Sequence, residues 1–189
     1  MKYVINDNTE ATTNLSYVTL DELEVTGANQ KRLNIKNSNI RGFLCSSKYA
    51  KINIKDCDFK NVLFDKTMIE PSFFSNSTFE RLVFNAENNI LNITFDDVSV
   101  QFMAFCGIDK MGITGLKFNN TKIKHIIFDD VNVWLWKFSD CHIEIFEIKG
   151  KKPVFFDFQN TNIDMLILDG KIIKGETADI INAISRNNL

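Results

Sequence analysis

Large apolar residues recur at every fifth position over most of the chain. In the stretch FNNTKIKHIIFDDVNV, residues 118–133, they are Phe118, Ile123, Phe128 and Val133. An amphipathic helix repeats its apolar residues about every 3.6 positions and a half-buried strand about every two, so neither element explains this spacing. The five-residue spacing therefore indicates a repeat architecture.

The same spacing extends along the chain in both directions. It runs from Leu15 to Phe84 with a one-residue slip before Ile54, and from Ile113 to Ile173 with Pro153 as its exception. A longer period comes from a hexapeptide, apolar-x-Asn/Asp-small-x-apolar, which begins at residues 35, 54, 74, 95, 118, 138 and 158. Four steps of five residues therefore make one coil of about twenty residues, a period typical of stacked repeats.

This pattern resembles that of the pentapeptide-repeat proteins, from about residue 15 to residue 173, although the small residue of the family's motif is kept mainly on one side of each coil. In that family every five residues form one side of a square coil. The resemblance implies an all-β fold, a right-handed parallel quadrilateral β-helix of about eight 20-residue coils. We expect a single domain in which residues 1–14 form an N-terminal cap, residues 15–175 the β-helix and residues 176–189 a C-terminal helix.

The four sides of a coil can be placed on the sequence. Side one ends at the first residue of the hexapeptide, side two at its last residue, side three five residues later, and side four leads into the next coil. In an extended side, the residue that ends it and the one two positions earlier point inward, and the residue between them points outward.

A column of Asn and Asp falls at the corner between sides one and two. Asn and Asp tolerate a positive φ and bond to their own backbone, so these residues are expected to form turns rather than a metal or catalytic row. The column consists of Asn37, Asp56, Asn76, Asp97, Asn120, Asp140 and Asn160.

The ends of an open β-helix need protection because they present unpaired strand edges. Near the C-terminus, Thr177 is placed to cap a helix whose apolar face carries Ile180, Ile181 and Ile184. This helix is expected to cover the last coil or to pair with its copy in a homodimer.

Composition and charge narrow the class of protein. The net charge is -2, and after the acidic first 30 residues the remaining chain holds 21 basic and 19 acidic residues. That balance makes direct nucleic-acid binding unexpected. We predict a cytoplasmic protein without a membrane partner, because no apolar run approaches the roughly 20 residues of a membrane span and the first residues do not resemble a secretory signal.

Catalytic and metal sites find little support in the sequence. Cys45, Cys57, Cys106 and Cys141 include no C-x-x-C pair, so we expect reduced thiols, no bound metal and no cofactor. Cys141 and His142 are adjacent on one side and should point to opposite faces. The carboxylate pairs Asp96–Asp97 and Asp129–Asp130 occupy turn positions. The sequence thus predicts no catalytic residue and a protein that is not an enzyme.

Two features indicate a binding surface. The outward column of side three should be polar, yet it is mostly apolar, which suggests that a partner protein, a second copy or the N-terminal segment covers it. Side four holds the irregular loops, of which residues 106–115 are the longest, and loops on a regular scaffold often carry function. The candidate partner-binding residues are Leu44, Leu63, Val83, Ile127 and Ile167 on side three, with Asp109, Lys110 and Met111 in the loop.

We therefore predict a non-enzymatic protein-binding scaffold that presents side three and a side-four loop to a macromolecular partner. An alternative comes from the family resemblance, since some pentapeptide-repeat proteins mimic duplex DNA, bind DNA gyrase and protect it from inhibitors. The near-neutral body of the chain weighs against that alternative, because a DNA duplex carries one negative charge per ~1.7 Å of axis.

Overall fold

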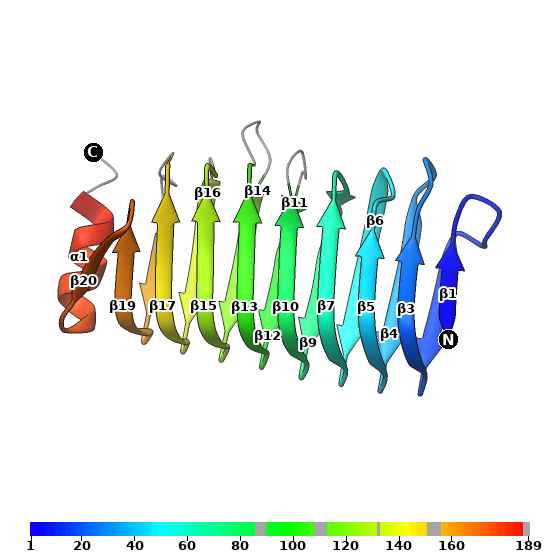
Figure 1. The fold of residues 1–189 in the computed structure, drawn as a ribbon, viewed down its shortest axis with the longest axis horizontal. Coiled ribbons are helices and arrows are strands. Elements are labelled where there is room, and N and C mark those ends of the chain that lie inside the picture. The colour runs from blue at the N-terminus through cyan, green and yellow to red at the C-terminus, as the bar shows by residue number, and fades with distance from the viewer. Residues whose placement is uncertain (86–89, 108–112, 132, 151–155, 187–189) are drawn as a thin grey trace.

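The computed structural model describes residues 1–85, 90–107, 113–131, 133–150 and 156–186. Over these residues the chain forms a parallel β-solenoid of about seven turns, followed by a short C-terminal helix. The strands stack into an elongated rod with the N-terminus at one end and the helix at the other (Figure 1). This architecture confirms the predicted all-β fold and its right-handed parallel β-helix, with about one coil fewer than expected.

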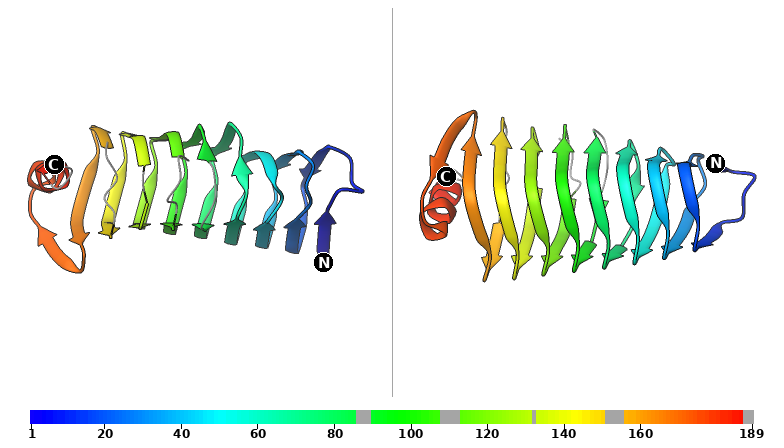
Figure 2. Two further views of the ribbon diagram at one scale, coloured as in Figure 1. Left: turned by 90° about the horizontal axis from the view of Figure 1, so that it is seen from above. Right: turned by 60° about the horizontal axis from the view of Figure 1, so that its bottom comes forward.

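Two sheets run along the rod and face each other across its core (Figure 2). Sides two and three of each coil form one strand of the first sheet, with two adjacent outward residues at the corner between them, as at Arg41 and Gly42. Neighbours in this sheet pair in parallel until the last two strands, which pair antiparallel. Its strands, in order, are β1 (Lys2–Ile5), β3 (Thr19–Val25), β5 (Asn39–Cys45), β7 (Asp58–Asp65), β10 (Thr78–Asn85), β13 (Ser99–Cys106), β15 (Lys122–Asp129), β17 (His142–Lys149), β19 (Asn162–Leu168) and β20 (Lys171–Lys174).

The second sheet is built from sides four and one. Some of its strands contain both sides, whereas others are interrupted at the corner between them. Its strands are β2 (Thr12–Ser16), β4 (Lys31–Lys36), β6 (Tyr49–Lys55), β8 (Met68–Ile69), β9 (Ser72–Ser75), β11 (Ile90–Leu91), β12 (Ile93–Asp96), β14 (Ile113–Asn119), β16 (Val133–Ser139) and β18 (Phe156–Gln159).

Residues 1–14, expected as a cap, contribute strands to the rod. β1 pairs in parallel with β3, so the first sheet begins at Lys2. The Asp7 carboxylate accepts hydrogen bonds from the amides of Ala28 and Asn29, and these bonds hold the pKa of Asp7 below its ordinary value. The buried Lys31 ammonium donates to the carbonyl of Thr9. The segment is thereby fastened to the following coil.

The Asn and Asp column turns the chain at the predicted corner. All seven residues have a positive φ, between 45° and 56°. The backbone amides of the first six, Asn37 to Asp140, each donate to a carbonyl of the next coil, as Asn76 does to Asp96. The side chains alternate between amide and carboxylate along the rod, and Asn76, Asn120 and Asn160 each donate to the carboxylate of the preceding coil. The corner prediction is confirmed.

Small inward residues on side two bond to this corner. The hydroxyls of Ser38, Ser77, Thr121 and Thr161 each donate to the carbonyl two residues earlier. The thiols of Cys57 and Cys141 donate in the same way. These side chains therefore satisfy polar backbone atoms inside the coil, in addition to keeping the narrow interior from overfilling.

Phenylalanine rings fill the interior in columns parallel to the rod axis. The rings of Phe84 and Phe105 stack with centroids 4.7 Å apart, and Phe118 stacks on Phe95 at 4.7 Å and on Phe138 at 4.6 Å. These separations match the ~4.8 Å between neighbouring strands, so a ring at one position sits directly on the ring of the next coil. All five side chains are fully buried.

The helix α1 (Thr177–Arg186) covers the last coil, which was one of the two arrangements expected from the sequence. Ile180 and Ile184 are buried in the core, and Ile181 packs against it. Thr177 was expected to cap the helix, but it is the first helical residue, and its hydroxyl accepts from the amide of Ile163 in β19, which fastens the helix to the rod. No helix in the described part of the chain is long and apolar enough to span a membrane.

The corner geometry predicts the cost of a branched side chain. Asn120 has φ 46° and donates to Asp97, so Asn120→Val should lower the free energy of unfolding by about 2 kcal/mol, mainly through left-handed backbone strain. Asn120→Gly keeps the backbone conformation and loses only an exposed hydrogen bond, so its cost should be about 1 kcal/mol or less. Urea unfolding followed by circular dichroism measures both. Equal losses for Val and Gly would contradict a backbone origin.

Candidate functional site: an apolar groove on side three

The outward column of side three forms one continuous row across the first sheet. The strand register places Glu24 beside Leu44, Leu44 beside Leu63 and Leu63 beside Val83. The row continues through Ala104, Ile127, Glu147 and Ile167. The predicted alignment of these residues is therefore what the structure shows.

The exposure of this row is less uniform than the sequence predicted. Leu44 is 37% exposed and Leu63 is 36% exposed, whereas Val83 is 9% exposed. Ile127 and Ile167 are partly buried. Val83 is thus a largely covered residue at the edge of the surface, and the apolar file is most exposed at Leu44 and Leu63. The loop candidates Asp109, Lys110 and Met111 lie outside the described residues.

A second row on the same face explains the difference. It lies two residues before the first, at the corner with side two, and it aligns Glu22, Gly42, Asn61, Arg81 and Phe102. Gly42 and Asn61 are small and leave the two leucines open. Arg81 and Phe102 are large, and the Arg81 guanidinium lies 4.7 Å from the centre of the Phe102 ring. The corner row was not predicted, because the five-residue spacing describes inward positions only. The contrast in size among its residues could have indicated a groove.

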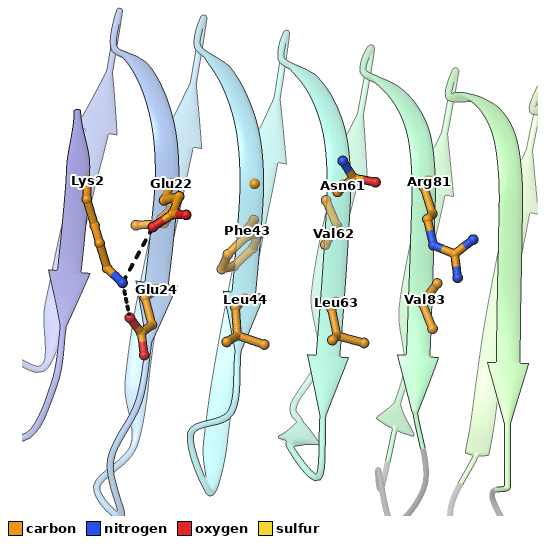
Figure 3. A pocket seen from close by; sticks show the side chains of 12 residues that line it. Lys2, Glu22, Glu24, Phe43, Leu44, Asn61, Val62, Leu63, Arg81 and Val83 are labelled. Atoms are coloured by element: carbon orange, nitrogen blue, oxygen red, sulfur yellow. Dashed lines mark ion pairs between the residues drawn. The ribbon is translucent and has the colours of Figure 1, made fainter.

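Between these residues lies a groove of about 570 Å³ that crosses β3, β5, β7 and β10 (Figure 3). Leu44 and Leu63 stand side by side in it (Figure 3), and Gly42 lines it without contributing a side chain. A Cβ atom at Gly42 would lie 3.3 Å from the carbonyl oxygen of Asp21. Glycine inside a strand often marks a corner bend or a close backbone approach, and Gly42 lies at such a corner against the preceding coil, where it leaves the groove open. The groove is therefore the candidate binding site.

The two ends of the groove carry opposite charge. At the β3 end, the Lys2 ammonium lies 2.8 Å from Glu24 and 3.5 Å from Glu22. The hydrogen bond and charge of Glu24 raise the pKa of Lys2. Two carboxylates share this one ammonium, so the β3 end is net negative, and the side chain of Glu22 is 63% exposed. The β10 end is positive through Arg81.

A buried carboxylate interrupts the row further along the rod. Glu147 is 7% exposed, and its two oxygens lie 2.8 Å from His125 Nε2 and 3.0 Å from Lys149 Nζ. The hydrogen bond and charge of Glu147 raise the pKa of Lys149. The His125 ring in turn packs edge-on against Phe102. These contacts satisfy Glu147 and link it to the basic end of the groove.

The thiols show no sign of activation. Cys141 is buried and His142 is exposed and bonded to Asp164, so the two point to opposite faces as predicted. All four cysteines are free, and burial raises the pKa of each thiol. The thiolate is the nucleophilic form, so these thiols are poor nucleophiles at neutral pH. Among the described residues, no group of three or more His, Cys, Asp or Glu could hold a metal ion.

The second carboxylate of each pair lies at a turn, as the sequence predicted, whereas the first, Asp96 or Asp129, is the last residue of a strand. Asp97 and Asp130 have positive φ values of 56° and 51° at the corners of their coils. Asp97 accepts a hydrogen bond from Asn120.

No family model, curated protein or solved structure matches the chain. Function is therefore inferred from the fold and from the groove.

The groove predicts binding of a small amphipathic anion. The dye 1-anilinonaphthalene-8-sulfonate should place its rings on Leu44 and Leu63 and its sulfonate near Arg81, with increased fluorescence. Leu63→Lys should lower this fluorescence several-fold by placing a charge in the apolar site. The matched control is Phe73→Lys on side one, where Phe73 is 43% exposed. Equal loss in both variants would show that the dye does not report on the groove.

Proposed function

We propose that the protein is a non-enzymatic scaffold that binds a partner protein in the groove of side three. The observation that carries this proposal is the pair of exposed leucines between an acidic and a basic end. A partner that fits the groove would cover the leucines and meet a charge at each end. Burial and charge complementarity are the two terms on which such recognition depends.

The free energy gained by burying the two leucines can be compared with what stable binding requires. Burying a leucine completely contributes about 1.5–3 kcal/mol, so covering the exposed third of Leu44 and Leu63 contributes roughly 1 kcal/mol or less for each. That is too little for stable binding by itself. The charged ends and the depth at Gly42 must therefore contribute specificity and the remaining affinity.

The rigidity of the rod supports a binding role. The groove residues lie on five neighbouring strands, β1 to β10, of a continuous hydrogen-bonded sheet over a core of stacked rings. A surface held in this way loses little conformational entropy on binding, which improves affinity for a given contact.

The chemistry of the groove also supports a non-enzymatic role. A lysine that acts as a general base needs a lowered pKa, whereas the pKa of Lys2 is raised by Glu24. The other titratable groups of the groove are Glu22, Glu24 and Arg81. Lys2 already forms an ion pair with Glu24, so contact with a partner is the simpler role for the charged groups of the groove.

The proposal keeps the remaining predictions in place. The loop residues Asp109, Lys110 and Met111 are proposed as a second contact, and a cytoplasmic location remains a prediction.

The solenoid is compatible with the resemblance to pentapeptide-repeat proteins, and we propose the chain as a divergent member. Binding to DNA gyrase by DNA mimicry is the less favoured alternative, because outward residues of side two mix Arg41, Lys60 and Lys124 with Asp58 and Glu80.

The proposal is tested by affinity capture with three forms of the chain. The native protein should retain a specific partner, Leu44→Glu with Leu63→Glu should lose at least ~90% of it, and Phe73→Glu should retain it. The reason is that two buried charges in the groove cost several kcal/mol, whereas Phe73 lies on another side. Circular dichroism confirms that all three forms are folded. A partner lost only with Phe73→Glu would place the binding surface on side one.

A further inference from the structure

We propose that the groove of side three binds the groove of a second copy of this chain, with the two rods antiparallel. This inference rests on the proposed binding role of the groove and names its partner. It follows from the order of residues across the four strands, which is complementary to itself.

The register sets the geometry of the pair. Along the corner row the order is Glu22, Gly42, Asn61 and Arg81, one residue on each of β3, β5, β7 and β10. A two-fold axis in the interface, parallel to the strands and between β5 and β7, reverses the order of strands and keeps each row facing its own copy. Such an interface is isologous, because both copies use the same surface: a residue i of one copy contacts residue j of the other, and j contacts i in return.

This operation brings opposite charges together at both ends of the contact. Glu22 faces Arg81 of the second copy, and Arg81 faces the second copy's Glu22. Glu22 is the freer acid, since its side chain is 63% exposed while that of Glu24 is 29% exposed and bound by Lys2 at 2.8 Å. The carboxylate and the guanidinium are separated within one chain by three strand spacings, about 14 Å.

The same operation matches shape and apolar surface at the centre. Leu44 faces Leu63 of the second copy, so the exposed leucines of both chains cover one another. Gly42 faces Asn61 of the second copy, so the larger corner residue meets the position that has no side chain. This arrangement accounts for both the missing side chain at Gly42 and the exposed leucines of the groove.

A parallel arrangement of the rods would not have this complementarity. With the two-fold axis along the rod, each strand would face its own copy, and the acidic ends of the two chains would meet. Like charges that face each other across an interface cost several kcal/mol. The charges therefore select the antiparallel arrangement.

The contact is small, so the dimer should be weak. The antiparallel overlap runs from β1 to β13, six strands or roughly 29 Å in length, and side three is about three residues or ~10 Å wide. The resulting contact plane of roughly 300 Å² per copy is below the ~800 Å² per partner of stable complexes. We expect association in the upper micromolar range.

Charge exchange tests this arrangement directly. In sedimentation velocity from ~10 µM to ~1 mM, the native chain should pass from monomer to dimer. Glu22→Lys alone and Arg81→Glu alone should each weaken the dimer by ~10-fold or more, because like charges then meet at both ends. An equal mixture of the two variants should regain a dimer of native affinity, because each charge at the two ends of the mixed dimer then faces an opposite charge.

Two controls keep the result specific. Asp157→Lys reverses a charge on side one, where Asp157 pairs with Lys137, and should leave the dimer unchanged. Recovery in the mixture shows that both variants are folded, and circular dichroism checks each one alone.

Three outcomes would overturn the inference. They are a native chain that stays monomeric over the whole range, a dimer that survives both single variants, and a mixture that fails to recover although both variants are folded. A monomeric native chain that still captures a partner lost with Leu44→Glu and Leu63→Glu would reject the second copy and leave the proposed binding function intact.

Discussion

At the corner between sides one and two the backbone of every coil turns at a residue with positive φ, and the regular stacking of the rod depends on that turn. At Asn37, Asp56 and their successors the chain leaves side one and enters side two with its amide bonded to the next coil. Because the turn recurs at the same place in every coil, equivalent residues fall on one another along the axis. The stacked rings of the core and the rows of side three both follow from this alignment.

The sequence predicted those features that depend on period alone. A five-residue spacing identifies the inward positions, and the Asn and Asp column identifies the corner, since few other residues adopt a positive φ without strain. The hydrogen bonds of Ser77 and Thr121 to the corner carbonyls were not predicted, because small size explained the same positions equally well. The strands within residues 1–14 were also missed, since the five-residue spacing begins at Leu15.

The candidate site was predicted only in part, for a physical reason. Period tells which way a residue points, but exposure depends on how large its neighbours are. Leu63 and Val83 occupy equivalent positions in successive coils, yet one lies beside Asn61 and the other beside Arg81. The groove therefore arises from a contrast between adjacent coils in the corner row. A repeat pattern describes what the coils have in common. It does not predict the differences between coils that form the groove.

The alternation of Asn and Asp at the corner has a consequence for how such a rod can change its length. The side-chain amides of Asn76, Asn120 and Asn160 each donate to the carboxylate of the coil before it. Duplicating or deleting a single coil would place two carboxylates, or two amides, next to each other about 5 Å apart, and adjacent carboxylates repel. Adding or removing two coils together would preserve the alternation. The natural unit for lengthening this rod is therefore a pair of coils, about forty residues, rather than the single coil that its backbone repeats.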